Sequence, residues 1–169
     1  MSGEKKLLFG IILSTVIILV GAIFFLTKST PAKIVLEKTT GAKSESLETN
    51  YDFKNIAFSG GDAIHEFKIK NIGDKDLQIA NLATSCHCTK VYFKSAKEVS
   101  PRFGMKGSSS ASDWVGILSP GEEGQVVADF DPTYHGPQGV GPISRIVSIE
   151  TNDPDKPYME FNFSGNVVK

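Results

Sequence analysis

The chain has 169 residues, of which 40% are apolar, and its formal net charge at pH 7 is -1. Acidic and basic residues are interspersed along it, without a basic stripe or an acidic tail. This balance argues against a protein that recognises nucleic acid by its charge, and we expect no nucleic-acid partner.

Residues 7–26 form an uncharged apolar run that follows a short tail, residues 1–6. A run of about 20 such residues is long enough to cross a bilayer as a helix. A cleavable signal peptide has a shorter apolar core, of about 7–15 residues, followed by a small-x-small cleavage site. Here the nearest such triplet, residues 30–32, has a proline at its centre. The sequence therefore predicts an uncleaved, transmembrane signal anchor at 7–26.

The charges beside this run do not fix its orientation by themselves. Lys5 and Lys6 precede it, and Lys28 and Lys33 follow it, so the positive-inside rule is partly balanced. The tail before the anchor is too short to fold, which leaves the folded part on the C-terminal side. We expect a single-pass protein of the cell membrane with an extracytoplasmic C-terminal domain.

The segment after the anchor, residues 27–50, is rich in Lys, Ser, Thr and Glu, which is typical of a linker. A short apolar run inside it could form a first strand at 34–37. Residues 51–169 then provide enough chain for one globular domain with a single core.

Apolar and polar residues alternate in several runs of this domain. In one run, His65, Phe67 and Ile69 alternate with charged residues, as in a half-buried strand. Turn signals separate the runs, and no segment after the anchor has helical periodicity. The pattern predicts an all-β fold, an antiparallel β-sandwich. Further runs lie at 77–80, 126–130, 143–150 and 159–167, with turns at 71–74, 119–121, 131–132 and 152–154.

Residues 95–113 break this rhythm and predict a long surface loop, because they contain Pro101, glycines and a run of serines. Loops of this length are often functional or mobile. Met105 in this loop could act as a soft metal ligand that reaches the cysteines. Trp114, at the end of the loop, would anchor it to the core.

Both cysteines of the chain, Cys86 and Cys88, flank His87. In an extended strand their Cα atoms would be about 6.8 Å apart, with both side chains on one face. A disulfide would then need a bent backbone, and strained disulfides are the redox-active kind. The two residues could equally pack as small apolar groups at a strand end. A dithiol redox role and a structural role are therefore both open.

Metal binding is the third interpretation of the pair. Two thiolates on one face suit Cu(I), whereas zinc prefers four ligands, usually with wider cysteine spacing. The predicted ligand set is Cys86, Cys88, His87 and Met105, and His65 or His135 are further candidates for the third ligand. No catalytic ordering of Ser, Cys, His and Asp and no phosphate-binding glycine loop is present, so we expect no enzymatic activity, no catalytic residues and no other cofactor.

Several short motifs occur in a characteristic order through the predicted domain. They are Tyr51-Asp52-Phe53-Lys54-Asn55-Ile56, His65-Glu66-Phe67, Asn71-Ile72-Gly73, Leu77-Gln78-Ile79, Ser85-Cys86-His87-Cys88-Thr89, Pro120-Gly121-Glu122 and Thr151-Asn152-Asp153. Together they resemble the DUF1573 family, a bacterial domain of unknown function marked by a Ser-Cys-Gly-Cys-Thr signature. The resemblance implies an immunoglobulin-like sandwich of about seven strands, distantly similar to Hydin-type and PapD-like domains and common in exported proteins. It implies no reaction.

Three features depart from the family pattern. His87 and Lys54 stand where the family usually has glycine, and the loop at 95–113 is longer than usual. The favoured hypothesis is a membrane-anchored, exported binding or scaffolding module of the bacterial cell envelope, which could take a partner strand by β-augmentation. The alternatives are a copper-handling protein that uses Cys86 and Cys88, and a thiol-disulfide redox partner.

Overall fold

The computed structural model describes residues 3–27, 33–108 and 112–169. Parts of the predicted tail, linker and long loop, residues 1–2, 28–32 and 109–111, lie outside the described residues. The chain divides after Ala32 into an N-terminal unit and a second compact unit, Lys33–Lys169.

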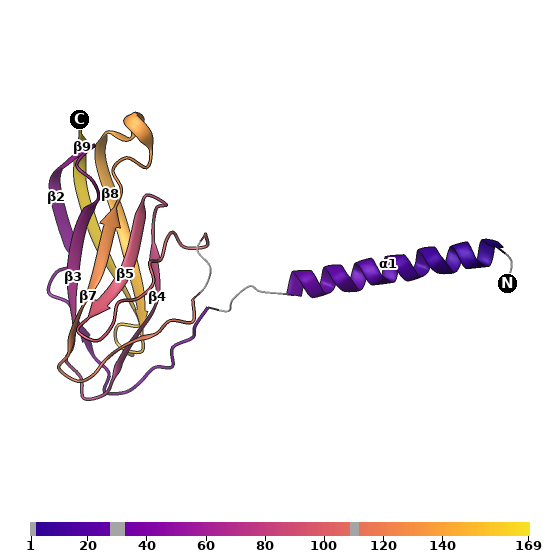
Figure 1. Ribbon diagram of the computed structural model, residues 1–169. Helices are drawn as coiled ribbons and strands as arrows, with labels where there is room; N and C mark the ends of the chain where they lie inside the picture. The colour runs from indigo at the N-terminus through magenta and orange to yellow at the C-terminus, as the bar shows by residue number, and fades with distance from the viewer. Residues whose placement is uncertain (1–2, 28–32, 109–111) are drawn as a thin grey trace. The chain divides into compact units, whose positions relative to one another are not determined.

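The N-terminal unit contains one helix, α1, Gly3–Thr27 (Figure 1). Its 25 residues correspond to a length of about 38 Å at 1.5 Å per residue. The stretch Gly3–Ile23 has a mean hydropathy of 2.5 and none of it is buried by protein, so its length and composition suffice to cross a membrane. The predicted N-terminal apolar helix is therefore confirmed.

The second unit is a sandwich of two sheets (Figure 1). This confirms the predicted all-β fold. The described residues form nine strands instead of about seven, because two very short strands extend the sheet edges. The first sheet has the order β1 (Ser44–Glu45), β3 (Ala63–Asn71), β7 (Glu123–Phe130), β5 (Thr89–Ser95). The second has the order β2 (Asn50–Ala57), β9 (Tyr158–Val168), β8 (Gly141–Thr151), β4 (Leu77–Thr84), β6 (Gly116–Leu118).

One strand pair differs from the expected antiparallel arrangement. Strand β2 runs parallel to β9, whereas the other pairs are antiparallel. The reason is a sheet switch: the chain leaves β1 at the edge of one sheet and enters β2 at the edge of the other. A short 3-10 helix, η1 (Gly136–Gly139), precedes β8.

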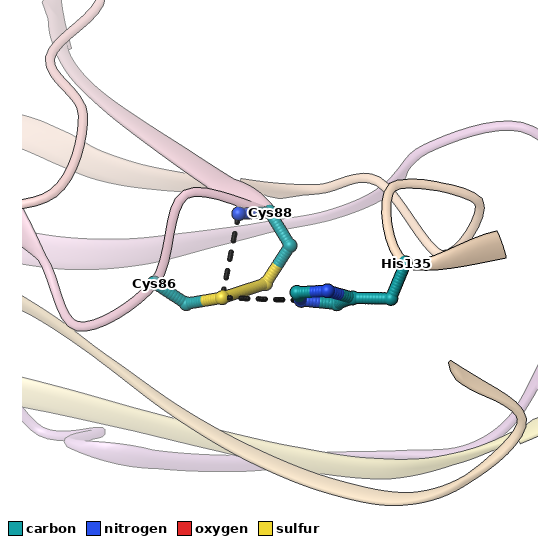
Figure 2. Close-up of side chains that lie close together, drawn as sticks. All are labelled: Cys86, Cys88 and His135. Atoms are coloured by element: carbon teal, nitrogen blue, oxygen red, sulfur yellow. Dashed lines mark hydrogen bonds between the residues drawn. A yellow bond between two sulfur atoms is a disulfide. The ribbon is translucent and has the colours of Figure 1, made fainter. Parts of the chain in front are cut away.

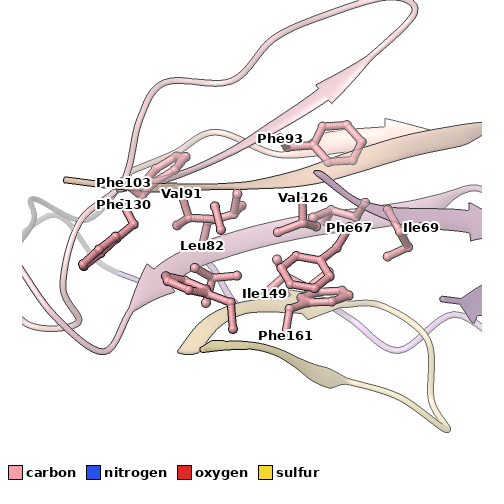
Figure 3. Packing of buried hydrophobic residues seen from close by; sticks show 14 of the residues in the cluster. Phe67, Ile69, Leu82, Val91, Phe93, Phe103, Val126, Phe130, Ile149 and Phe161 are labelled. Carbon is pink, nitrogen blue, oxygen red and sulfur yellow. The ribbon is translucent and has the colours of Figure 1, made fainter. Parts of the chain in front are cut away.

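The core lies between the two sheets and is rich in phenylalanine (Figure 3). Phe67 and Ile69, on alternate positions of β3, are fully buried, as their period-two pattern predicts. The ring of Phe67 faces that of Phe161 on β9, with 5.1 Å between the ring centroids. Burial of one such side chain contributes about 2–3 kcal/mol. Aromatic contacts of this kind hold the sheets together.

The buried asparagines of the family motifs are hydrogen-bonded to turns. The side-chain amide of Asn71 donates to the carbonyls of Lys75 and Leu118, at 2.8 Å each. The amide of Asn152 donates to the carbonyl of Asp76 at 3.0 Å and its oxygen accepts from the Gln78 N–H at 2.8 Å. Each buried asparagine therefore uses its own amide group to hold neighbouring turn and strand backbone together.

The compact unit begins at Lys33, earlier than the predicted domain start at residue 51. Residues 33–43 lie against the domain without strand structure, so the structure has no strand at 34–37. The carbonyl of Ile34 accepts a hydrogen bond from the side chain of Asn81 at 2.8 Å, and Lys33 pairs with Glu150. Ala42 is fully buried. The segment docks through side chains, which a polar composition does not reveal.

The start of the predicted loop at 95–113 is fixed to the sheet. Phe103 exchanges two backbone hydrogen bonds with Val91 of β5, at 2.9 and 2.7 Å. The N–H of Ser100 donates to the carbonyl of Phe93 at 2.8 Å. Trp114 packs against the ring of Phe93, with 5.7 Å between centroids, as expected for an anchor. The described part of this loop therefore covers the outer edge of β5.

Candidate functional site

The two cysteines lie where the chain crosses from one sheet to the other. Thr84 ends β4 in the second sheet, and Thr89 begins β5 in the first. The four residues between them form a tight turn, which is closed by a hydrogen bond from the Thr89 N–H to the Cys86 carbonyl at 3.2 Å. The Thr84 hydroxyl donates to the same carbonyl at 2.8 Å. The expected extended geometry around the cysteines is therefore replaced by a bend.

The serine of the signature ties this turn to the neighbouring strand. The Ser85 N–H donates to the carbonyl of Ile146 at 2.9 Å. The Ser85 hydroxyl accepts from the Ile146 N–H, also at 2.9 Å. Ile146 belongs to β8, so these bonds hold the turn to the second sheet. The residues around the cysteines thus have structural roles of their own.

Cys86 and Cys88 are joined by a disulfide, as the yellow bond in Figure 2 shows. Their Cα atoms are 5.3 Å apart, closer than in an extended strand, because the turn bends the backbone between them. The two sulfurs differ in access. Cys88 belongs to the core and is only 2% exposed, whereas Cys86 is half-buried and packs at the margin of the core.

Each sulfur contacts a nitrogen from a distant part of the chain. The Nε2 atom of His135 lies 3.6 Å from the Sγ atom of Cys86 (Figure 2). The Nε–H of Arg145 donates to the Sγ atom of Cys88 at 3.2 Å. His135 immediately precedes η1, and Arg145 lies on β8. Both nitrogens can donate to sulfur, so each can stabilise negative charge there.

Of the predicted metal ligands, the structure brings Cys86 and Cys88 together with His135. Among the described residues, these three offer donor atoms that all lie within 4.8 Å of one another. His87 is exposed on the turn. Met105 lies beside Thr84 through a backbone bridge and is one of the residues that line a separate groove. Copper binding itself stays a prediction.

His65 is not part of the cluster of Cys86, Cys88 and His135. Its ring stacks on Tyr51 with 3.5 Å between centroids, and its Nε2 atom lies 2.8 Å from a carboxylate oxygen of Glu48. It is therefore engaged in packing between β2 and β3. Arg145 is the residue that sequence reasoning missed. Its alternation along β8 marks it as an ordinary strand residue, and nothing in the sequence connects it to Cys88.

The DUF1573 family model, described as a protein of unknown function, matches residues 45–102. This match confirms the family resemblance. It includes the cysteine turn and the strands on both sides of it, and the family description assigns no activity. No protein of curated function matches the chain.

The solved structures similar to this chain include two proteins, of which the first supports the fold. A protein of unknown function from Porphyromonas gingivalis W83 is similar over 82% of this chain and 51% of its own, at 17% identity and a TM-score of 0.54. The chain therefore spans about half the length of that protein. A PapD-like domain of human CEP192 is similar over 83% of this chain and 97% of its own, at 19% identity and a TM-score of 0.47. At these identities the likeness concerns the fold alone.

Proposed function

We propose that this protein is a single-pass membrane protein whose domain lies outside the cytoplasm and binds an extended segment of another envelope protein. The proposed role is binding rather than catalysis. The apolar helix α1 supports the anchor, since its uncharged length matches a bilayer. The sandwich supports the binding role, because a sheet edge with unpaired backbone groups can accept an additional strand.

The single observation that carries this proposal is the uneven protection of the sheet edges. The segment around Phe103 covers the outer edge of β5. Strand β6, which pairs with the edge of β4, has only three residues. Farther along β4, the backbone N–H of Lys106 donates to the carbonyl of Thr84 at 3.2 Å. Strand β2 carries a bulge with Lys54 at a φ of 60°. Short strands, bulges and covering segments are the ordinary means of preventing edge pairing.

The outer edge of β3 is protected only toward its C-terminal end. In the described part of the chain, β1 pairs only with Lys70 and Asn71, which leaves Ile64 and Glu66 of this edge without a strand partner. The carbonyl of Lys68 accepts from the Ser46 hydroxyl at 2.7 Å, which shows that it faces this edge. Backbone groups at alternate positions face the same way. A groove of about 430 Å³ lies beside the strand, and Leu47 on its wall is 96% exposed.

Site-specific photo-crosslinking in intact membranes tests the proposal. A photoreactive residue at Ile64, on β3, is expected to capture a partner, whereas one at Ile117, on β6, is expected to capture much less. The two positions are matched, since both isoleucines lie on edge strands and are 52% and 45% exposed. Equal capture at both, or no adduct at Ile64, would refute the edge as a docking site.

Glu66→Pro provides a second arm of this experiment. Proline removes the backbone N–H that faces the open edge, while the pairing of β3 with β7 uses the neighbouring residues. The crosslink from Ile64 should then disappear. Glu66→Lys changes the side chain but keeps the N–H, so it should retain the crosslink. Protease access to a C-terminal tag, in intact cells and in cells with a permeabilised outer layer, tests the orientation separately.

Copper handling is a second candidate, favoured by the proximity of Cys86, Cys88 and His135. Two thiolates and an imidazole are suitable ligands for Cu(I), and they become available once the disulfide is reduced. Competition with a chromophoric chelator under anaerobic conditions measures the affinity. His135→Gln should weaken binding, whereas His87→Gln is the matched control with the same change outside the cluster. Binding that is unchanged by Cys86→Ser would remove this candidate.

A further inference from the structure

We propose that Cys86 and Cys88 form a thiol-disulfide exchange site that accepts two electrons from a dithiol, with Cys86 as the attacked sulfur and Arg145 as the residue that stabilises the departing one. The proposed reaction is independent of strand binding at β3. It follows from three observations: the two sulfurs differ in access, a cation contacts the buried sulfur of Cys88, and an imidazole contacts the more accessible sulfur of Cys86.

Access determines which sulfur a thiolate can reach. Exchange begins when an incoming thiolate attacks one sulfur of a disulfide from outside. Cys88 is 2% exposed, so its sulfur is closed to an external nucleophile in the folded protein. Cys86 is half-buried and lies on the side of the exposed residue His135. Attack is therefore directed to Cys86, and Cys88 becomes the leaving group.

Arg145 is placed to stabilise the sulfur that leaves. Its Nε–H already donates to Cys88 at 3.2 Å, and its Nη1 group is fixed by a 2.8 Å hydrogen bond to the Ser144 carbonyl. Among the described residues, no carboxylate forms an ion pair with this guanidinium. Its charge is therefore available to a thiolate, and hydrogen bonds to charged groups are the stronger kind.

The reaction has two steps. A thiolate of the dithiol forms a bond to Cys86, the bond between Cys86 and Cys88 breaks, and its electron pair leaves on Cys88 beside Arg145. The second thiolate of the dithiol then attacks the other sulfur of the same dithiol, which is bonded to Cys86 in the mixed disulfide. Cys86 leaves with the electron pair beside His135, which can donate a proton to it. The dithiol becomes a disulfide and loses its two protons to solvent. Cys86 and Cys88 gain two electrons, Cys86 takes its proton from His135, and Cys88 stays a thiolate beside Arg145.

The primary experiment uses the full chain in detergent with a metal chelator. Graded ratios of reduced to oxidised dithiothreitol set the conditions, alkylation and intact-mass measurement count the thiols, and Trp114 fluorescence reports the fold. We expect the disulfide to be reduced while the domain remains folded. A disulfide that opens only when the domain unfolds would overturn the proposal.

Substitutions of Arg145 test its role, with a substitution of Lys90 as the control. Arg145→Met should slow reduction and shift the equilibrium toward the disulfide, each by about tenfold, because the thiolate loses a charge-assisted hydrogen bond. Arg145→Lys, which restores the charge, should recover part of both losses. Lys90→Met is the matched control, since it removes the same charge from an exposed position close to Cys88. Equal effects of Arg145→Met and Lys90→Met would overturn the assignment.

Single-cysteine variants test the direction of attack. Cys88→Ser leaves the accessible thiol and should form a mixed disulfide with oxidised glutathione at least about tenfold faster than Cys86→Ser. Equal rates, or a faster reaction at Cys88, would overturn the direction. In the chain with both cysteines, His135→Gln should make the mixed disulfide between Cys86 and dithiothreitol accumulate at least about tenfold in acid-quenched samples. The reason is that Cys86 loses a proton donor. His87→Gln should leave its amount unchanged, and the same accumulation in both variants would overturn the role of His135.

Discussion

Replacement of Lys54 by glycine should stabilise the domain relative to replacement by alanine. Lys54 has a φ of 60°, in the left-handed region, at the bulge of β2. A residue with a Cβ atom loses about 1–2 kcal/mol in that region, and glycine does not. Glycine in turn loses about 0.4–1 kcal/mol more backbone entropy on folding than alanine does. The difference leaves glycine ahead by about 1 kcal/mol.

The comparison with alanine isolates the backbone effect. Both variants remove the exposed ion pair between Lys54 and Asp52, which solvent screens, so its contribution cancels. Both also keep the hydrogen bond from the backbone N–H of residue 54 to the Asp52 carboxylate, 2.9 Å in the native chain. The family usually has glycine at this position, which is the residue that the bulge favours.

Urea unfolding of the segment 33–169, followed by Trp114 fluorescence, measures this difference. About 1 kcal/mol corresponds to a midpoint shift of roughly 3–4 °C in a thermal experiment on a domain of this size. Lys68→Gly and Lys68→Ala provide the control, because Lys68 lies at an exposed, regular position of β3 and alanine should be the more stable there. If alanine is also the more stable at position 54, the strain argument is refuted.

Three further outcomes are expected in the same unfolding assay. Burial raises the pKa of Asp153, but hydrogen bonds from the Ser44 N–H and hydroxyl, at 2.7 and 2.8 Å, together with other backbone donors, outweigh it and lower the pKa below the ordinary 3.8. The carboxylate therefore stabilises the fold above pH 3.8 and loses this effect as the pH falls further, and Asp153→Asn should reduce the acid sensitivity; an unchanged pH profile would contradict this. Asn152→Ala should destabilise by about 1–3 kcal/mol, since the backbone groups of Asp76 and Gln78 lose two part-buried hydrogen bonds, and a cost below about 0.5 kcal/mol would contradict it. Gly124→Ala should cost about 1–3 kcal/mol, because its Cβ atom would lie 2.5 Å from the ring of Phe93, and an unchanged stability would show that the ring can move away.

The sandwich was predictable because side-chain alternation reports directly which face of a strand is buried. Phe67 and Ile69 on β3 follow that rule, and the turn at Asn152 carries its own composition signal. The start of the domain was not predictable in this way. The segment at 33–43 is polar and irregular, and it docks through single contacts such as Asn81 with the Ile34 carbonyl. Composition describes average solvation and cannot identify such contacts.

The cysteine site was predictable only in part. The sequence places Cys86 and Cys88 side by side, but parity along an extended strand does not describe them, because β4 and β5 belong to different sheets and the chain must bend between them. His135 and Arg145 come from positions 49 and 57 residues away from the sulfurs they contact. No local pattern encodes contacts of that separation. The order of the family motifs indicated where the two cysteines lie in the fold, but not which residues surround them.

The size of the disulfide loop argues against a mainly structural purpose for the bond. A link between residues with a sequence separation of two closes a very small loop, for which the chain-entropy estimate is only about 1.6 kcal/mol. The turn is also held by hydrogen bonds that involve Thr84, Ser85 and Thr89, each worth about 0.5–1.5 kcal/mol. These bonds do not depend on the sulfur oxidation state. We therefore expect the domain to retain its turn while the cysteine pair is reduced and reoxidised, which an exchange site requires and a structural crosslink does not.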